Sequence, residues 1–531
     1  MTIALYILAL LTVTANLVME LRRDLMMFQQ NSYRIDRYRK WLSESGDTTS
    51  VARMLGFATF FVALIPKVPH VAAMPLMGLF AIINTISLVR RKYKKPLVMT
   101  NRAMRIFAAS LLCAALATSL TVSFMSAPGI LGALFTASVT LIGCYCGSHL
   151  LIMLAAMLLS PWEKNINMQY INDARRRLEQ MPDLKIIGIT GSYGKTTTKH
   201  YLTRILSEHY ETLMTPGSYN TTMGVVRTIR EYLKPYHEVF VVEMGAKQPD
   251  DIAEICRLVH PQRGIITAVG PQHLESFKTI DNVQRTKFEL ADSLPATGLI
   301  VLNNDFEKIA DRPVDNVPCL RYAVKNTENA DYVAFDIKYS NAGTDFTVRR
   351  NSDGATLQLR TRLVGECNIS NILGAVVMAQ HMGVPDEKIR YAVEQLEQVE
   401  HRLSIKRVPG GLTIIDDAFN SNPVGSAMAL DVLAAMDGKR ILVTPGMVEL
   451  GTEEFELNKE FGRKAASSCD VAIVVGAYNR EAICSGLSEG GMPKQNIHTP
   501  DTFAQAQQLL RTIAGKGDTV LYENDLPDTF K

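Results

Sequence analysis

The sequence predicts an α/β protein in three parts: an N-terminal transmembrane helical region, a central phosphate-loop domain with a parallel sheet, and a C-terminal Rossmann-like domain. Three observations support this division. The first 160 or so residues are apolar and nearly free of acids, whereas the remainder has the mixed charge of a water-soluble protein. A glycine-rich loop follows a short apolar strand near residue 190. Beyond residue 400, strands alternate with helices a second time, which is typical of α/β domains.

Length and composition limit the alternatives. At 531 residues the chain is too long for one ordinary core, so two or three domains are expected. The net charge of +3 gives no reason to expect a nucleic-acid partner. The eight cysteines are scattered, without a CxxC pair or a Cys/His cluster at zinc-ligand spacing. We therefore expect reduced thiols and no zinc site.

Residues 1–162 are predicted to form a membrane region of about five transmembrane helices. The first apolar run, Thr2 to Met19, is long enough to cross a hydrocarbon core of roughly 30 Å at about 1.5 Å per helical residue. The block from Met54 to Val89 carries a single charge and is interpreted as two helices around a tight turn. The block from Ile106 to Trp162 has no Asp, Glu, Lys or Arg, and Pro128-Gly129 divides it into two more spans.

The placement of Lys and Arg predicts the orientation of these helices. Basic residues gather in two loops, within residues 22–53 and 90–105, while the alternate connections carry only Lys67. By the positive-inside rule both loops face the cytoplasm, and five crossings leave the rest of the chain there as well. We therefore expect a multi-pass protein of the cytoplasmic membrane. Residues 163–182, with Arg175–Arg177, are predicted to form a juxtamembrane amphipathic helix whose basic side contacts anionic membrane lipids.

A phosphate-binding loop is predicted at the start of the central domain. Lys185 to Thr190 is a short buried strand, the segment Gly188–Thr197 reads GITGSYGKTT, and a helix follows. In this arrangement backbone N–H groups and the helix N-terminus surround phosphates, with Lys195 as a point charge and Thr196 as a magnesium ligand. The general pattern GxxxxGK[ST] would require glycine where Ile189 stands.

With this departure, the segment Gly188–Thr197 resembles the phosphate loop of the Mur ligases, the enzymes that add amino acids to the peptidoglycan stem. Further motifs follow in the family's order through essentially the whole chain after Asp183. They are Gly217–Gly224 (GSYNTTMG), Val242–Gly245 (VEMG), Gly270–Phe277 (GPQHLESF), Thr286–Leu290 (TKFEL), Gly365–Asn371 (GECNISN), His401-Arg402 and Asp416–Pro423 (DDAFNSNP). The last string, with Gly446–Gly451 (GMVELG), is similar to the MurF branch, which joins D-alanyl-D-alanine to a UDP-N-acetylmuramoyl-tripeptide.

The resemblance implies a fold and a reaction. Residues 183–400 would form a central P-loop Mur ligase ATPase domain, and residues 401–531 a C-terminal Rossmann-like ligase domain without a dinucleotide fingerprint. The implied enzyme is an ATP-dependent ligase that forms an amide bond through an acyl phosphate made with the γ-phosphate of ATP. Its partners would be the carboxylate of a muramoyl peptide, or of another envelope precursor, and a D-Ala-D-Ala-like amine.

The resemblance also implies the residues that hold ATP and two Mg²⁺ ions. ATP would contact Gly191, Ser192, Gly194, Lys195, Thr196, Thr197, Asn371, Arg402 and Asp417. The metals would be held by Thr196 and Glu243 and by His273 and Lys287, and the catalytic set would be Lys195, Glu243, His273, Lys287 and Arg402. We expect Lys287 to be carbamylated, because an ammonium repels Mg²⁺ whereas a carbamate offers a hard anionic oxygen.

The substrate contacts are less specific. Asn220, Thr221 and Thr222 resemble the substrate-side loop, and Asn420 and Asn422 could contact the incoming dipeptide. Such residues are also ordinary turn formers, and a helix cap is the alternative for Asn371.

The sequence departs from the family in two ways. Membrane helices stand where the soluble members carry a domain that holds the UDP part of the substrate. Pro445-Gly446 replaces the usual Gly-Asp, and Cys367 stands where many relatives have His. Three alternatives therefore remain: a ligase for another envelope polymer, including a polyglutamate-like one; a ligase for a lipid-linked muropeptide; and a non-enzymatic membrane scaffold.

Overall fold

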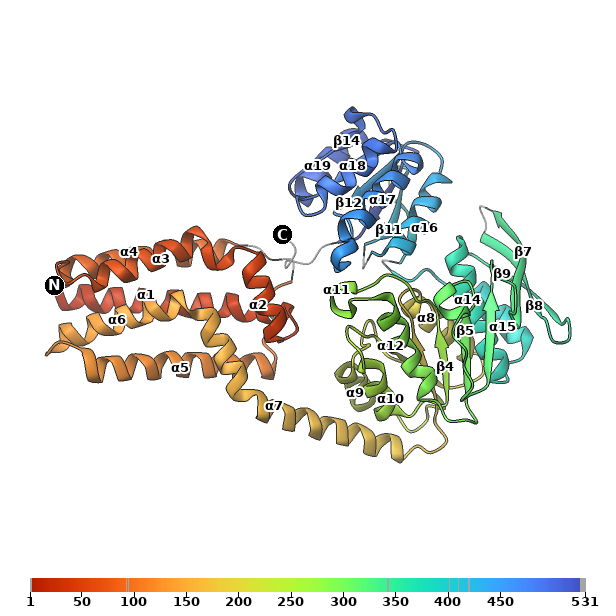
Figure 1. Ribbon diagram of the computed structural model, residues 1–531, viewed down its shortest axis with the longest axis horizontal. Coiled ribbons are helices and arrows are strands. Elements are labelled where there is room, and N and C mark those ends of the chain that lie inside the picture. The colour runs from red at the N-terminus through yellow and green to blue at the C-terminus, as the bar shows by residue number, and fades with distance from the viewer. Residues whose placement is uncertain are drawn as a thin grey trace. The chain divides into compact units, whose positions relative to one another are not determined.

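The computed structural model describes residues 2–340 except 92 and 94, and residues 343–525 except 401, 409, 419 and 420. They form two compact units, a helical unit up to Asn167 and an α/β unit from Met168 to Asp525 (Figure 1). Each unit has its own buried apolar core, as expected for parts of a chain that fold separately.

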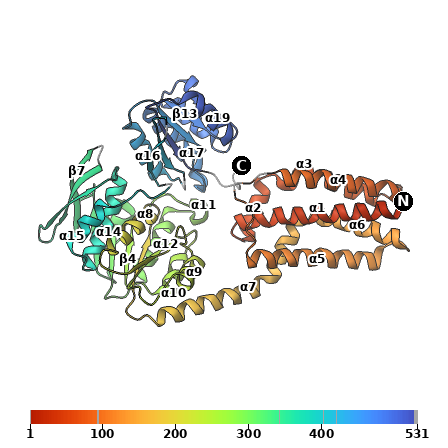
Figure 2. The same cartoon turned by 180° about the vertical axis from the view of Figure 1, so that it is seen from behind.

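The helical unit packs around its first helix. α1 lies between α4 and α6 (Figures 1 and 2). Val13 of α1, Met77 of α4 and Ile142 of α6 are fully buried in the core of the unit. The elements are α1 (Thr2–Gln30), α2 (Ile35–Glu44), η1 (Asp47–Thr49), α3 (Val51–Leu64), α4 (His70–Arg90), α5 (Asn101–Met125), α6 (Ile130–Cys146) and α7 (Ser148–Glu179).

The described helices include fewer candidate membrane spans than the sequence pattern predicted. α1, α4 and α5 are each long and apolar enough to cross a membrane. α6 and α7 pass the same test only as a pair bent by 79°, as a broken span or a re-entrant loop. α3 is apolar but has 14 residues, about 21 Å of helix at 1.5 Å per residue and short of the roughly 30 Å core. The described residues thus give three candidate spans, or four with the bent pair, instead of about five.

The helical unit carries apolar side chains on its outside and polar ones inside. Leu11, Ile83 and Phe124 are 62%, 60% and 83% exposed. Asn16 and Asn84 are buried, and the Asn84 side-chain amide donates to Asn16 Oδ1 at 2.8 Å. Large exposed apolar patches are rare on soluble monomers.

A buried ion-pair network joins α1 to α3 and to the break between α6 and α7. Arg53 Nη2 lies 3.0 Å from both Asp24 Oδ2 and Glu20 Oε1. Its Nη1 donates to the Tyr145 carbonyl at 2.7 Å and to Ser148 Oγ at 2.8 Å. Glu20 and Asp24 belong to α1, which continues beyond the apolar run. The predicted span ends at Met19 because Glu20 is charged, and the cation on α3 that compensates these acids could not be found from the local pattern.

Arg53→Met is expected to lower the thermal midpoint of the full chain in detergent. Glu20 and Asp24 would stay buried with one cation fewer, and breaking a buried ion pair costs about 3–5 kcal/mol. Arg34→Met is the control, since Arg34 pairs with the exposed Asp36 and such pairs contribute roughly 0–1 kcal/mol. Equal midpoints for the two variants would contradict the structural role of Arg53.

The first part of the α/β unit is the middle domain, built on a nine-stranded sheet in the order β2-β3-β1-β4-β5-β6-β7-β8-β9. Neighbouring strands are parallel up to β7, and β7, β8 and β9 are antiparallel. The elements are β1 (Lys185–Thr190), α8 (Lys195–Leu206), β2 (Thr212–Met214), α9 (Thr222–Glu231), β3 (Val239–Glu243), α10 (Asp251–Val259), β4 (Arg263–Ile266), α11 (Leu274–Phe277), α12 (Ile280–Asp292), β5 (Leu299–Asn303), α13 (Glu307–Ala310), β6 (Cys319–Ala323), β7 (Tyr332–Ser340), β8 (Gly343–Arg350), β9 (Thr356–Thr361), α14 (Glu366–His381) and α15 (Asp386–Glu394). The predicted parallel sheet and its antiparallel extension are confirmed.

Helices cover both faces of this sheet, which explains its continuous apolar strands. In β1, Ile187 and Ile189 pack with α8, α14 and α15, whereas Ile186 packs on the other side with α9, α10 and α12. Successive residues of a strand point to opposite faces, so a strand covered on both sides must be apolar throughout. The polar side chains that act on ligands are therefore left to the strand ends.

The C-terminal end of α7 packs on the middle domain. Ala174 is fully buried in its core. Arg230 of α9 pairs with Asp173 at 2.7 Å, and Arg177 donates to the Arg230 carbonyl at 2.8 Å. The helix predicted within residues 163–182 is present, and part of its charged surface contacts protein.

The second part of the α/β unit is a smaller domain with six strands in the order β10-β11-β15-β12-β13-β14. β10 and β11 are antiparallel and the other pairs are parallel. The elements are β10 (Ser404–Val408), β11 (Leu412–Asp417), α16 (Pro423–Ala434), β12 (Arg440–Thr444), η2 (Gly451–Glu453), α17 (Glu454–Ser468), β13 (Val471–Val474), α18 (Arg480–Glu489), η3 (Lys494–Asn496), β14 (Ile497–His498), α19 (Phe503–Ile513) and β15 (Thr519–Glu523). This agrees with the Rossmann-like domain predicted from the strand and helix pattern.

Candidate functional site

The phosphate loop lies between β1 and α8, at the carboxyl end of the parallel strands. Gly191 and Gly194 have φ angles of 152° and 76°. A Cβ on Gly191 would lie 2.2 Å from Thr267 Oγ1, and one on Gly194 would lie 2.4 Å from Asn371 Oδ1. Only glycine fits these two positions. The loop can therefore bring its backbone N–H groups close to a ligand.

The remaining loop residues are anchored to the chain that follows β4. The backbone N–H of Ser192 donates to the Ala268 carbonyl at 2.7 Å, and its hydroxyl donates to the Gly270 carbonyl at 3.1 Å. Thr197 is buried in the first turn of α8. The neighbouring strand end thus sets the shape of the loop.

Lys195 turns back onto the phosphate loop. Its Nζ donates to the carbonyls of Gly191 at 2.6 Å and Ser192 at 3.1 Å. Burial lowers the pKa of Lys195 to about 8, while Glu243 opposes this shift and Arg402 adds to it. An anion within the loop would favour the charged form of this amine.

Glu243, the last residue of β3, is 1% exposed and has three polar neighbours. Its Oε1 accepts hydrogen bonds from Thr196 Oγ1 and Asn220 Nδ2, both at 3.1 Å. Its Oε2 lies 3.0 Å from Lys199 Nζ. Burial raises the pKa of Glu243, but Lys199 and Lys195 outweigh burial and the pKa ends below its ordinary value. The carboxylate is therefore ionised.

His273 precedes α11 and has a left-handed backbone, with φ 52°. Its Nδ1 contacts the carboxylate of Glu449, which also pairs with Lys247 at 3.2 Å. Burial raises the pKa of Glu449, but His273 and Lys247 together bring it below its ordinary value. Burial lowers the pKa of His273. A neutral imidazole that donates its Nδ1 proton to Glu449 keeps the Nε2 lone pair for a metal.

Lys287 lies on α12 and is 1% exposed. It forms no hydrogen bond or ion pair with any residue that the structure describes, and its Nζ is 6.0 Å from the Phe277 ring centroid. Burial lowers the pKa of Lys287 far below its ordinary value, and the charge of Lys195 adds to the shift. Burial therefore favours the neutral, nucleophilic form of its amine.

Three further predicted residues lie on separate elements. Asn371 is inside α14 and accepts from Thr198 Oγ1 at 3.1 Å, so it is not a helix cap. Arg402 lies in the segment between the two domains and is half-buried. Asp417 ends β11, and its Oδ1 accepts from the Leu403 backbone at 3.0 Å. Burial raises the pKa of Asp417 to about 6, although Leu403 and Arg402 oppose the shift.

The residues predicted to contact substrate are divided. Asn220 lies at Glu243, as described above. Thr221 caps α9, of which Thr222 is the first residue, and Asn422 caps α16 through a hydrogen bond of 2.7 Å. The side chains of Thr221 and Asn422 therefore fit the alternative of turn and cap formers. Asn420 lies outside the described residues.

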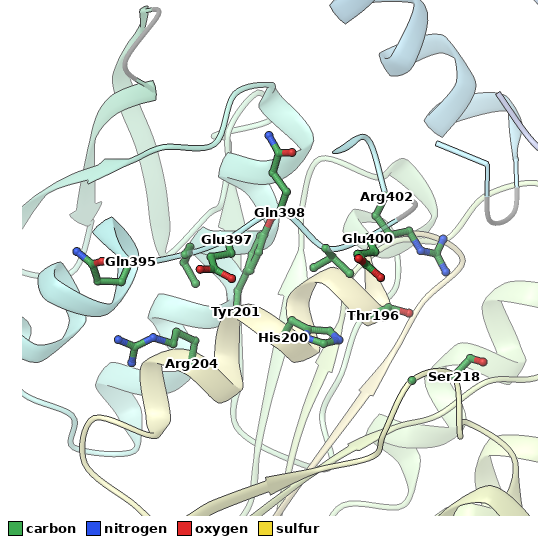
Figure 3. A pocket seen from close by; sticks show the side chains of 13 residues that line it. Thr196, His200, Tyr201, Arg204, Ser218, Gln395, Glu397, Gln398, Glu400 and Arg402 are labelled. Carbon is green, nitrogen blue, oxygen red and sulfur yellow. The ribbon is translucent and has the colours of Figure 1, made fainter. Parts of the chain in front are cut away.

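A cavity of about 700 Å³ adjoins α8 (Figure 3). Thr196 and Arg402 lie at one end of its lining, and Arg204 and Gln395 lie at the other (Figure 3). Ligand-binding cavities span about 300–1,000 Å³. This cavity is therefore large enough for a small molecule that also reaches the start of α8.

The donor set suits Mg²⁺ together with a phosphorylated ligand. No three His, Cys, Asp or Glu side chains gather into a metal site among the described residues. Mg²⁺, however, is usually held by one or two carboxylates plus substrate phosphates. Thr196 and Glu243 offer a hydroxyl and a carboxylate 3.1 Å apart. The cations Lys195, Lys199 and Arg402 exceed the charge of Glu243, which suits a polyanion.

Two residues of this site were missed by the sequence analysis. Lys199 is fully buried and donates to the Gly217 carbonyl at 2.7 Å as well as pairing with Glu243. Its position four residues after Lys195, on the same helix face, was a usable signal. Glu449 lies in the GMVELG string, but its pairing with His273 could not be found from spacing.

The phosphate loop and the cations Lys195, Lys199 and Arg402 near Glu243, here called the cation-rich pole, suit a polyphosphate ligand. Together with the Rossmann-like C-terminal domain they indicate a nucleotide-dependent enzyme with two catalytic domains. The Mur ligase middle domain family matches residues 189–379, and the family described as Mur ligase, glutamate ligase domain, matches residues 401–522. The catalytic part of the chain thus belongs to the Mur ligase family and is an ATP-dependent ligase.

The chain is similar to several named proteins. A UDP-N-acetylmuramoyl-tripeptide–D-alanyl-D-alanine ligase of Escherichia coli K12 is 29% identical over 343 residues, 64% of this chain and 75% of that protein. The Bacillus subtilis ligase of the same name is 27% identical over 346 residues, 64% of this chain and 72% of that protein. The solved structure of MurF from Acinetobacter baumannii matches with a TM-score of 0.61 at 26% identity. The match covers 67% of this chain and 77% of the MurF chain. MurF from Thermotoga maritima in complex with ADP matches with a TM-score of 0.59 at 26% identity. The match covers 67% of this chain and 80% of that MurF chain.

Gly194→Ala is expected to weaken binding of a non-hydrolysable ATP analogue with Mg²⁺ by about tenfold. The added Cβ would collide with Asn371, and a left-handed non-glycine residue costs roughly 1–2 kcal/mol. Gly354→Ala is the control, because Gly354 has φ 73° and a Cβ there meets nothing within 4 Å. Isothermal titration calorimetry measures both. Unchanged affinity in Gly194→Ala would mean that this loop does not hold the nucleotide.

Proposed function

We propose that this chain uses ATP to join D-alanyl-D-alanine, or a related amine, to the carboxylate of a muramoyl peptide in cell-wall biosynthesis. One observation carries the proposal. Both Mur ligase domains occur in the chain, and the relatives from Escherichia coli and Bacillus subtilis are named as ligases of this kind. The rival view of a non-catalytic scaffold gives no reason for a buried, cation-rich pole beside the phosphate loop.

The reaction needs positive charge in a fixed geometry. ATP supplies the γ-phosphate that turns the substrate carboxylate into an acyl phosphate, from which the amine displaces phosphate and loses a proton. Two anions meet in the first step, so the site must lower their repulsion. We assign the phosphates of ATP to Lys195, Arg402 and the N–H groups of residues 191–197. Asn371 is assigned to the adenine and Asp417 to the ribose.

We assign two Mg²⁺ ions to four residues. Thr196 and Glu243 would hold the metal between the β- and γ-phosphates, which their mutual hydrogen bond supports. His273 and Lys287 would hold the second. Both metals would neutralise charge that develops during phosphoryl transfer.

Five residues are assigned to contacts with the two substrates. Asn220 is proposed to contact the carboxylate substrate, because its amide already lies at Glu243. Thr221, Thr222, Asn420 and Asn422 are proposed contacts of the carboxylate substrate or the incoming amine, with helix capping as the competing role for Thr221 and Asn422.

Lys287 is proposed to carry a carbamate. Lys287 is buried and has no hydrogen-bonded partner among the described residues, which disfavours the charged form of its amine, and the neutral form can attack CO₂. The new N–C bond forms with loss of one proton, and the side chain gains an anionic oxygen ligand. This would convert a group that repels Mg²⁺ into one that binds it.

Lys287→Ala is expected to lower ligase activity by about 10²–10³-fold, the loss typical of removing one electrostatic group from such a site. Carbon-13 NMR of the protein in labelled bicarbonate is expected to show a carbamate signal that this variant lacks. Lys234→Ala, at an exposed lysine, is expected to keep both the signal and the activity. A wild-type protein without the signal would contradict the modification.

We infer that the helical unit lies in the cytoplasmic membrane, as a multi-pass anchor with the ligase domains in the cytoplasm. The outward apolar faces and the candidate spans support this. Arg22 of α1, Arg39 of α2 and Arg90 of α4 are exposed within the two basic segments, and Arg175 and Arg176 are exposed on α7. Their charges suit anionic lipid headgroups, which we propose as partners.

A membrane-borne acceptor is the second candidate. The apolar helices precede the ligase domains in the same chain, and α7 runs without a break from Ser148 to Glu179 into the α/β unit. A lipid-linked muropeptide would be confined to the surface at which such an enzyme is anchored.

The purified full chain in detergent is expected to release ADP faster when UDP-N-acetylmuramoyl-tripeptide and D-alanyl-D-alanine are both present. A lipid-linked muropeptide in liposomes, with the same amine, tests the second candidate. Lys195→Ala is the control and should abolish stimulation, because it removes a charge from the phosphate loop. Stimulation by the lipid-linked substrate alone would favour the second candidate, and no stimulation by either would contradict both.

A further inference from the structure

The two ligase domains meet at a contact centred on Glu449. Its carboxylate pairs with Nδ1 of His273 and with Lys247 Nζ at 3.2 Å. Its carbonyl oxygen accepts the backbone N–H of Glu275 at 3.3 Å. One residue of the C-terminal domain therefore holds the middle domain through both its side chain and its backbone.

The backbone on both sides of this contact is in the left-handed region, where few non-glycine residues lie. The φ angles of His273 and Glu449 are 52° and 64°. Gly446 and Gly451 flank Glu449 with φ angles of 82° and 65°, and a Cβ on Gly451 would come within 3.3 Å of the Glu275 nitrogen. Such conformations persist where several contacts determine them together. The contact is therefore specifically shaped, unlike an incidental surface ion pair.

The contact also decides which nitrogen of His273 is available. A carboxylate that accepts the Nδ1 proton fixes the tautomer and the rotation of the ring. Nε2 then carries the lone pair. Because Glu449 belongs to the other domain, this arrangement exists only when the two domains are docked.

We propose that Glu449 is a positioning residue that presents Nε2 of His273 to the second catalytic metal. The inference rests on the proposed function, in which His273 binds that metal. It adds that the metal site is complete only when the C-terminal domain, which also carries Asp417, is docked on the middle domain. Phosphoryl transfer would thereby be restricted to the docked state, with both the nucleotide and the second domain in place.

Lys247 provides the matched control. It lies in the same contact and pairs with the same carboxylate, but it does not touch His273 in any hydrogen bond or ion pair among the described residues. Replacing Lys247 therefore removes only a tether between the domains, whereas replacing Glu449 also removes the group that orients His273.

The experiment titrates Mn²⁺, in place of Mg²⁺, into the full chain in detergent with a non-hydrolysable ATP analogue, and counts bound metal by electron paramagnetic resonance. Glu449→Ala is expected to weaken the second, His273-dependent metal by about 10–100-fold, as removal of a carboxylate behind a metal-binding histidine does. Glu449→Gln should recover part of that affinity, since its carbonyl oxygen still accepts from Nδ1. Lys247→Ala should change it by less than about twofold, as for an exposed ion pair.

Two further measurements separate positioning from loss of the fold. The first metal, assigned to Thr196 and Glu243, should bind unchanged in every variant. In steady-state assays, Glu449→Ala should raise the KM for Mg²⁺ and leave the KM for ATP within about twofold, because only a residue that acts on the metal separates the two constants.

The outcomes distinguish this inference from the proposed function. If Glu449→Ala binds both metals like the wild type while His273→Ala loses the second, the positioning role is wrong and the proposed function stands. If His273→Ala also keeps both metals, the assignment of His273 as a ligand is wrong. If Lys247→Ala weakens the second metal as much as Glu449→Ala does, Glu449 is a tether only and the inference is overturned.

Discussion

Charge compensation around one buried carboxylate organises the catalytic pole of the middle domain. Glu243 is ionised in a place with almost no access to water, which would be costly without nearby cations. Lys195 and Lys199 supply more positive charge than it needs. Lys195 donates to the carbonyls of its own loop. Its positive charge also lowers the pKa of Lys287. An incoming polyphosphate would meet a pole already arranged for anions.

The fold explains why these groups meet. The strands of the middle domain are apolar on both faces, so polar side chains occur where the strands end and the chain turns into a loop or helix. β1 leads into the phosphate loop, β3 ends at Glu243, and the chain after β4 reaches His273. The C-terminal domain contributes Asp417 from the end of β11 and Glu449 from the chain that follows β12. Each domain thus supplies a part of the site.

The helical unit meets the same constraint in a different way. Its buried acids Glu20 and Asp24 are compensated within the unit by Arg23 and Arg53, and the guanidinium of Arg53 also satisfies carbonyls at the end of α6. Such a network stabilises a particular packing of helices. In the catalytic pole, by contrast, compensation is unequal, and the excess charge is available for a ligand.

The local pattern of residues was enough to predict the phosphate loop, the parallel sheet, the Rossmann-like domain and most of the residues around Glu243. These features depend on the order of strand, glycine loop and helix, and on apolar periodicity over a few residues. Ion pairs and hydrogen bonds between distant segments were not predictable in this way: His273 and Glu449 are 176 residues apart, and Arg53 and Ser148 are 95 apart. The length of α3, and the use of Thr221 and Asn422 as helix caps, also depend on where the chain turns. Only tertiary packing decides which charges meet, because removing a charge from water is costly and is offset by a partner that the fold brings beside it, wherever that partner lies in the chain.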